Sequence, residues 1–251
     1  MAAADLPGTA RRLRVGLGAT TREFIREPIN LILLVALPPL VIVSYGSMMD
    51  AFPQLPYMTT DPGTLGAMAG TLYVAAFLPG VIGLFQVISA RRADDRLALA
   101  GFRRPLLFAT RLLAVVLASL LTAGIALVVL TTRTDVAMLG PAFGTLALVG
   151  VMYGLIGMCI GAVLPRELEG SLVLIFLADF DEAMASGVVH TDSVVADLLP
   201  LHYPHALFQT AVNGGDIAAG DAAAAGAYAV GLLAVALVAY SALTSDGGVL
   251  A

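Results

Sequence analysis

The feature that most limits how this chain can fold is a series of six long apolar segments. They cover residues 29–49, 65–89, 106–130, 141–164, 170–185 and 222–243. A helix rises about 1.5 Å per residue, so about 20 apolar residues cross the hydrocarbon core of a bilayer. Only 12% of the residues are charged, against roughly 25% in soluble domains. The sequence therefore predicts an all-α integral membrane protein with six transmembrane helices in contact with the lipid bilayer.

The arginines predict how these helices are oriented. Twelve of the thirteen arginines lie before the first segment, in or beside the connection between the second and third, or after the fourth; the exception is Arg133. Cytoplasmic connections of membrane proteins are enriched in basic residues. We therefore expect a multi-pass protein of the plasma membrane with both termini in the cytoplasm, and aspartate-rich connections outside.

The stretch before the first segment has the pattern of an amphipathic helix. At about 100° per residue, apolar and basic side chains fall on opposite faces, with Leu13, Leu17 and Phe24 on one and Arg11, Arg22 and Arg26 on the other. Such a helix lies in the membrane interface. The alternative is a solvated basic tail with an accidental period. We expect a cytoplasmic elbow over residues 1–28 and a transmembrane domain over 29–251.

Three acids in the weakest segment, Asp179, Asp181 and Glu182, are the most unusual residues of the chain. Charged side chains at membrane depth are costly and often mark a transport pathway. Alternatively, the fifth span ends near Leu177, and the acids belong to an outward, re-entrant region over residues 179–216. This region also contains His190, His202 and His205. Imidazole and carboxylate can ligate metals, but the spacing matches no metal-site motif, and we expect none.

The connection over residues 91–105 mixes charges of both signs with apolar residues. It is compatible with a surface helix that contacts a partner, or with a solvated loop that only sets the topology. The residues that would form a contact are Asp94, Asp95, Arg96, Leu97, Leu99, Phe102, Arg103 and Arg104. Leu97, Leu99 and Phe102 are the apolar members, which would fill a pocket on the partner.

Four glycines of the fourth segment fall on one helical face: Gly150, Gly154, Gly157 and Gly161. Small residues at this spacing let membrane helices approach closely, so we interpret them as packing residues. The chain contains no lysine. A phosphate-binding loop of the Gly-x-x-x-x-Gly-Lys-Ser/Thr type requires one. No catalytic set of nucleophile and base is present either.

The order of these features resembles the permease family of type-2 ABC transporters. Four places along the chain carry the resemblance: Arg26-Glu27-Pro28, residues 37–46 around Pro38-Pro39, residues 94–107 with Arg111, and residues 198–206. They are similar to the family's elbow, its proline-containing first helix, its coupling segment and the proline-rich stretch before its last helix. The Gly-Thr-Leu-Glu often seen in that coupling segment is replaced by Asp95-Arg96-Leu97-Ala98.

The resemblance implies a half-transporter with the type-2 ABC exporter fold. Its partners would be an ABC ATPase subunit, which holds ATP and Mg, and a second permease copy or paralogue, with no nucleic acid. No cofactor and no enzymatic activity are expected in this chain itself. The elbow would include Arg22, Phe24, Arg26, Glu27 and Pro28. An outward gate would include Asp179, Asp181, Glu182, His202 and His205.

Two other classes of function remain open from the sequence. One is a multi-span membrane enzyme in which the acids and histidines hold a metal. The other is a secondary transporter that uses no ATP. A soluble ATPase encoded in a neighbouring reading frame would favour the ABC permease, and its absence would favour the two alternatives.

Overall fold

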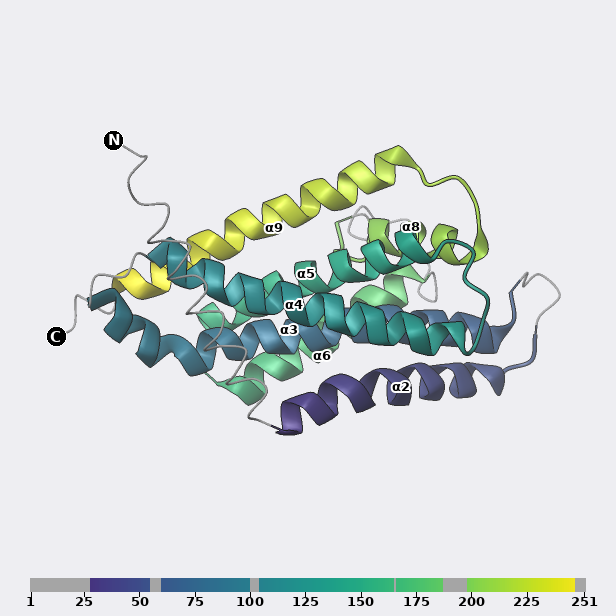
Figure 1. Ribbon diagram of the computed structural model, residues 1–251, viewed down its shortest axis with the longest axis horizontal. Coiled ribbons are helices and arrows are strands. Elements are labelled where there is room, and N and C mark those ends of the chain that lie inside the picture. The colour runs from purple at the N-terminus through teal and green to yellow at the C-terminus, as the bar shows by residue number, and fades with distance from the viewer. Residues whose placement is uncertain (1–27, 55–59, 100–103, 165, 187–197, 247–251) are drawn as a thin grey trace.

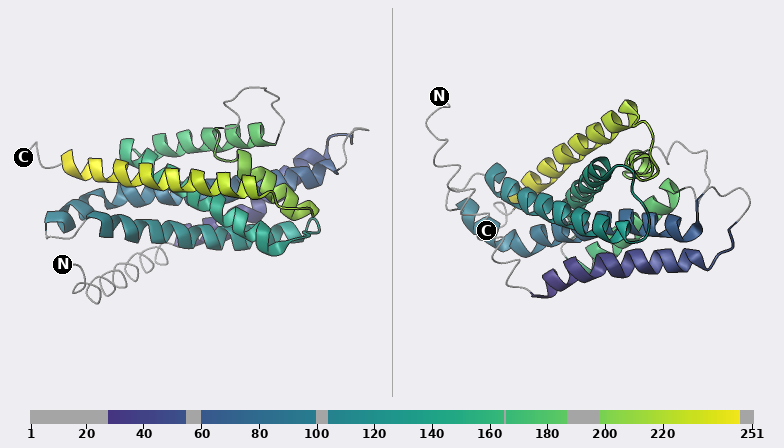
Figure 2. Two further views of the ribbon diagram at one scale, coloured as in Figure 1. Left: turned by 90° about the horizontal axis from the view of Figure 1, so that it is seen from above. Right: turned by 45° about the vertical axis from the view of Figure 1, so that its right-hand side comes forward.

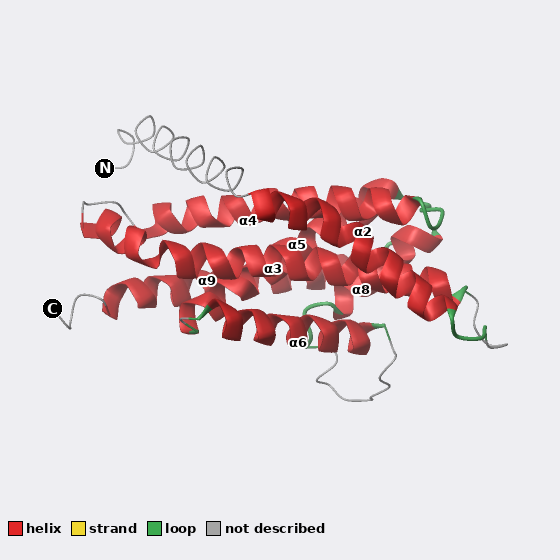
Figure 3. Cartoon of the chain, turned by 90° about the horizontal axis from the view of Figure 1, so that it is seen from below, coloured by secondary structure: helices red, strands yellow, loops and turns green. Residues whose placement is uncertain are grey.

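A computed structural model of the chain describes residues 28–54, 60–99, 104–164, 166–186 and 198–246. In this part of the chain all regular structure is helical (Figure 3). The helices are α2 (Pro28–Asp50), α3 (Pro62–Leu99), α4 (Arg104–Thr131), α5 (Leu139–Val163), α6 (Glu167–Ala185), α8 (His202–Asn213) and α9 (Ala219–Asp246). The prediction of an all-helical architecture is confirmed for the described residues.

The six long helices run side by side in alternating directions, with α2 along one edge of the bundle and α9 along the other (Figure 1). One end, called here the arginine-rich end, contains the end of α3 and the start of α4, with Arg91 and Arg96. The other, called the acidic end, contains the connections that carry Asp50, Asp61 and Asp216. The charge asymmetry of the sequence is therefore also an asymmetry between the two ends of the bundle.

Four helices are long and apolar enough to cross a membrane, namely those over Pro62–Arg91, Pro105–Thr131, Leu139–Val163 and Ala219–Ser241. Within α2 the apolar part, Leu34–Asp50, is shorter than these four. Helix α6 is not among the four, and it carries the three acids. The chain thus has the helices of a membrane protein, and the count of six spans stays a prediction.

The structure bears on two boundaries. Helix α6 continues through the three acids to Ala185, the end of the fifth apolar segment, so residues 179–185 are helical and the helix does not end near Leu177. Helix α3 continues to Leu99, so residues 91–99 extend the second apolar helix and are not a loop. In α3 a run that contains several good helix formers continues the helix beyond the apolar segment.

Glycines allow α5 to lie in the centre of the bundle. A Cβ atom on Gly157 would lie 2.0 Å from the carbonyl oxygen of Gly80 on α3, and one on Gly154 would lie 2.1 Å from Cγ1 of Val115 on α4. A Cβ atom on Gly161 would lie 2.8 Å from the carbonyl oxygen of Leu84, and one on Gly150 would lie 2.7 Å from Cβ of Ser119. There is no room for a larger residue at these four positions, so their small size sets the distance between the helices.

The short helix α8 lies at the acidic end, beside the start of α9 (Figure 2). Its apolar face is buried through Leu207, Phe208, Ala211 and Val212. Its last turn is fixed by backbone hydrogen bonds, in which the N–H groups of Ala137 and Met138 donate to the carbonyls of Val212 and Ala211, at 3.0 Å and 2.9 Å. Helix α8 is thereby attached to the connection between α4 and α5.

Candidate functional site

The candidate site lies near the acidic end of α6, where three acids occur within four residues. Successive residues of an α-helix are about 100° apart, so Asp179 and Asp181 face nearly opposite sides. Asp181 and Glu182 are buried, whereas Asp179 is exposed. The acids therefore form a buried pair, Asp181 and Glu182, and a separate exposed carboxylate.

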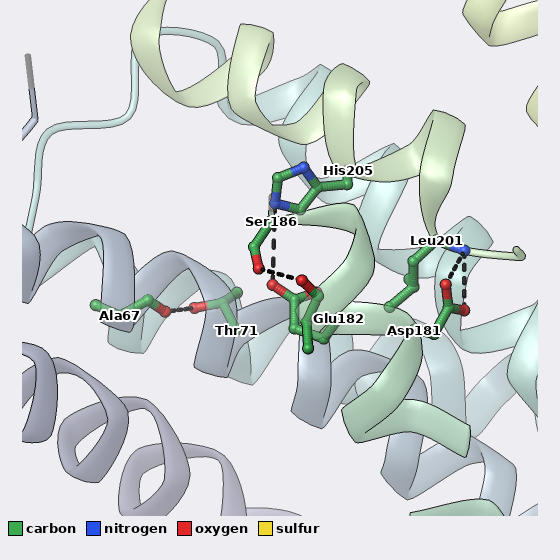
Figure 4. A network of polar contacts seen from close by, with 8 residues as sticks. Ala67, Thr71, Asp181, Glu182, Ser186, Leu201 and His205 are labelled. Atoms are coloured by element: carbon green, nitrogen blue, oxygen red, sulfur yellow. Dashed lines mark hydrogen bonds and ion pairs between the residues drawn. The ribbon is translucent and has the colours of Figure 1, made fainter. Parts of the chain in front are cut away.

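Asp181 is fully buried and has two hydrogen-bond donors. The hydroxyl of Tyr153 on α5 donates to its carboxylate. The backbone nitrogen of Leu201 lies 3.0 Å and 3.2 Å from the two carboxylate oxygens (Figure 4). Hydrogen bonds to a charged acceptor are stronger than those between neutral groups. The two donors let Asp181 keep its charge inside the protein, and they join α6 to α5 and to the residue that precedes α8.

Glu182 has no such donors. Its side chain is buried, and neither of its carboxylate oxygens has a hydrogen-bond partner within the described residues. The nearest basic group is His205 on α8, with Nε2 3.9 Å from Oε1 of Glu182 (Figure 4). Burial, together with the neighbouring His202, lowers the pKa of His205 to about 4. His205 is therefore neutral at neutral pH and supplies no positive charge to Glu182.

Asp179 faces a different neighbour. The Tyr45 hydroxyl on α2 donates to its carboxylate at 3.2 Å. The ring of Tyr45 stacks on Tyr73 of α3 at 5.8 Å between centroids, and Tyr73 stacks on Phe77 at 5.7 Å. This chain of contacts connects α2 and α6 across α3.

Three of the five residues expected in the outward gate come together: Asp181, Glu182 and His205. His202 lies one turn before His205 and packs edge-on against Tyr203, and Asp179 is exposed and accepts a hydrogen bond from Tyr45. Sequence reasoning missed Tyr153 and Tyr45, which supply the donors to Asp181 and Asp179. The only sequence signal for these donors is that each tyrosine places a polar hydroxyl within an apolar segment. In the described part of the chain no three His, Cys, Asp or Glu side chains are grouped closely enough to hold a metal ion.

The arginine-rich end contains the residues expected to contact an ATPase. Arg96 is exposed, whereas Leu97 is half-buried and packs against the bundle's own apolar cluster around Phe108 and Tyr240. Arg91 donates a hydrogen bond from NH2 to the carbonyl of Ala162 on α5, at 2.9 Å. Leu97 therefore packs in part within the chain itself, and its contact with a partner stays a prediction.

Other predicted residues lie outside what the structure describes. For the contact segment, these are Phe102, Arg103 and the side chains of Asp94, Asp95, Leu99 and Arg104. For the elbow, they are Arg22, Phe24, Arg26 and Glu27, while Pro28 is the first residue of α2.

Comparisons with protein-family models and with curated proteins find no match for this chain. The resemblance to type-2 ABC permeases therefore depends on the residues quoted from the sequence, and it is carried forward as a proposal.

Proposed function

We propose that this chain is the membrane-spanning permease subunit of an ABC transporter, working in export with a separate ATPase and a second permease copy or paralogue. The observation that carries the proposal is the length of α3. Its 38 residues give a rod of about 57 Å, against about 30 Å for the hydrocarbon core. The segment after Arg91 thus extends α3 about 12 Å beyond its candidate span.

This extension has the properties of a mechanical connection. Arg91 fixes its start to α5, Leu97 packs its last turn against the cluster around Phe108, and Arg96 remains exposed. Helix α3 also packs against α2, α4, α5 and α6. A force applied to the extension at the exposed Arg96 would therefore reach every one of these helices. A chain without a lysine for a phosphate-binding loop requires such a surface if ATP drives it.

The buried acid pair and α8 lie at the opposite end, where we place the outward gate. The plasma membrane and cytoplasmic termini belong to the same proposal, through the positive-inside rule. Four helices with exposed apolar faces, including α2 and α9, support contact with lipid and with a second permease.

The test is site-specific photocrosslinking in the native host. A photoreactive amino acid is placed at Arg96 and, as the matched control, at Arg133, an exposed arginine at the acidic end. We expect position 96 to crosslink to a chain that carries Gly-x-x-x-x-Gly-Lys-Ser/Thr, and position 133 not to. In parallel, Arg96→Glu should reduce co-purification of that chain, and Arg133→Glu should not.

Crosslinking of no nucleotide-binding chain at position 96, or equal crosslinking at both positions, would contradict the proposal. The secondary transporter without ATP would then be favoured.

A further inference from the structure

Glu182 is a buried acid whose position requires an explanation. Both of its oxygens are enclosed, and neither has a hydrogen-bond partner within the described residues. Its neighbour Asp181 has two donors and can remain ionised. Two adjacent carboxylates that share a buried site disfavour a second negative charge. An ionised Glu182 would therefore lack both a donor and a compensating charge.

The groups around Glu182 do not supply that charge. The titratable side chains that face the acids are Asp179 and Asp181 on α6 itself, Tyr45 on α2, Tyr73 on α3, Tyr153 on α5, His202 and His205 on α8, and Tyr228 on α9. None is an arginine. Only His205 lies within ion-pair distance of Glu182 in the described part of the chain.

We propose that Glu182 and His205 form a binding site for a single proton that holds α8 against α6. The proton resides on Glu182, whose O–H donates to Nε2 of the neutral imidazole. A small side-chain rotation converts the present 3.9 Å separation into a hydrogen bond of about 2.8 Å. The proton comes from water at the acidic end and returns there when Glu182 ionises. On binding, one O–H bond of a hydronium ion breaks and the O–H bond of Glu182 forms, and release of the proton is the reverse.

Loss of this proton weakens the attachment of α8. The pair on α6 then carries two adjacent negative charges, which become favourable only when water reaches them. Movement of α8 away from α6 admits that water. The proton site rests on the proposed function only in treating α8 as an outward gate. The experiments below use the permease alone, so their outcome is independent of the ATPase crosslink.

The first experiment detects the proton itself. Infrared spectra of the purified protein in lipid nanodiscs are recorded at neutral pH, where a protonated carboxyl group gives its own C=O band. We expect this band to lose intensity in Glu182→Gln. Glu169→Gln is the matched control, because Glu169 lies on the same helix but is exposed and paired with Arg166 at 2.6 Å. This variant should leave the band unchanged.

The second experiment follows α8. Spin labels are attached at Phe180→Cys on α6 and Ala206→Cys on α8, two exposed positions, in a Cys159→Ser background that removes the native cysteine. Distances between the labels are measured from neutral to alkaline pH. Because detachment of α8 releases one proton, the ratio of detached to attached α8 should rise about tenfold per pH unit. Glu182→Gln, which mimics the protonated acid, should abolish this rise, and Glu169→Gln should not.

A third variant does not depend on changing Glu182. His205→Phe retains a ring and removes the acceptor, so the longer distance should appear already at neutral pH. The proposal is overturned if Glu182→Gln leaves the carboxyl band intact, if wild type and Glu182→Gln respond identically to alkaline pH, or if His205→Phe keeps the short distance.

Discussion

Replacing Tyr153 by Phe tests the buried acid pair by removing one hydroxyl and retaining the ring. Tyr153 is fully buried and its hydroxyl donates to Asp181. In the variant, Asp181 keeps only the N–H of Leu201 as a donor. Tyr45→Phe is the matched change, because it removes the same group from the exposed Asp179. Comparing the two variants isolates the effect of burial.

The size of the effect follows from burial and charge. A hydrogen bond to a charged group contributes about 1.5–3 kcal/mol, and an unpaired buried acceptor adds a desolvation cost. Hydrogen bonds between membrane helices average about 0.6 kcal/mol and reach about 1.7 kcal/mol. Asp181 combines charge with full burial, so we expect Tyr153→Phe to cost about 2 kcal/mol, or about 30-fold in the folding equilibrium. Water can replace the hydroxyl at Asp179, so Tyr45→Phe should cost less than about 1 kcal/mol.

The assay is reversible unfolding of the purified protein in mixed micelles, with the free energy of unfolding obtained for each variant. Asp181→Asn and the double variant with Tyr153→Phe complete a double-mutant cycle, whose coupling energy should exceed about 1 kcal/mol. Equal losses for Tyr153→Phe and Tyr45→Phe, or no coupling between Tyr153 and Asp181, would refute the assignment of a charged, buried Asp181.

Two further predictions concern packing and pH. Gly157→Ala should destabilise the protein by about 1–3 kcal/mol, because the new Cβ would lie 2.0 Å from a backbone oxygen of α3. Gly144→Ala on the same helix is the control: its Cβ would meet nothing within 4 Å, so this variant should be neutral or slightly stabilising. Thermal unfolding of both variants measures the difference. Because the pKa of His205 is lowered from 6.5 to about 4, the imidazole of His205 binds less proton in the folded protein than in the unfolded one between these values. The contribution of His205 to the free energy of unfolding should therefore fall as pH drops from 6.5 towards 4, by up to about 3 kcal/mol, and unfolding titrations should show this fall as the difference between wild type and His205→Phe.

The sequence predicted the helices better than their boundaries. Hydropathy located the apolar segments, because each must match the thickness of the bilayer. It could not show that α3 continues to Leu99, and it left open whether α6 ends near Leu177 or at Ala185, because charged residues such as Arg96 and Glu182 are themselves good helix formers. Hydropathy measures where a helix is apolar, and a helix that continues through charged residues gives no hydropathy signal there.

The candidate site was predicted in part for a related reason. Charged residues within an apolar segment are conspicuous, so the acids of α6 could be identified, and His205 was included because it lies in the same outer region. Their partners were not predictable, because Tyr153 lies 28 residues from Asp181 in sequence and the second donor is the backbone of Leu201. Backbone donors have no sequence signature. Asp181 is buried and Asp179 is exposed because of the helices that flank α6, and the sequence does not show which helices these are.

Helix α3 connects the two ends of the proposed transporter without a direct contact between the extension beyond Arg91 and the acid pair. A Cβ on Gly80 of α3 would lie 2.7 Å from Cδ2 of Leu174 on α6, and one on Gly170 of α6 would lie 2.6 Å from Cδ1 of Leu84 on α3. The leucine side chains thus occupy the space above these glycines and pack the two helices together, and packed interiors yield little to displacement. A tilt of α3 driven from its arginine-rich end would therefore move α6 as well. Glu182 lies two turns beyond Leu174 on that helix, so the same tilt would shift Glu182 relative to His205 and change how tightly the proton is held.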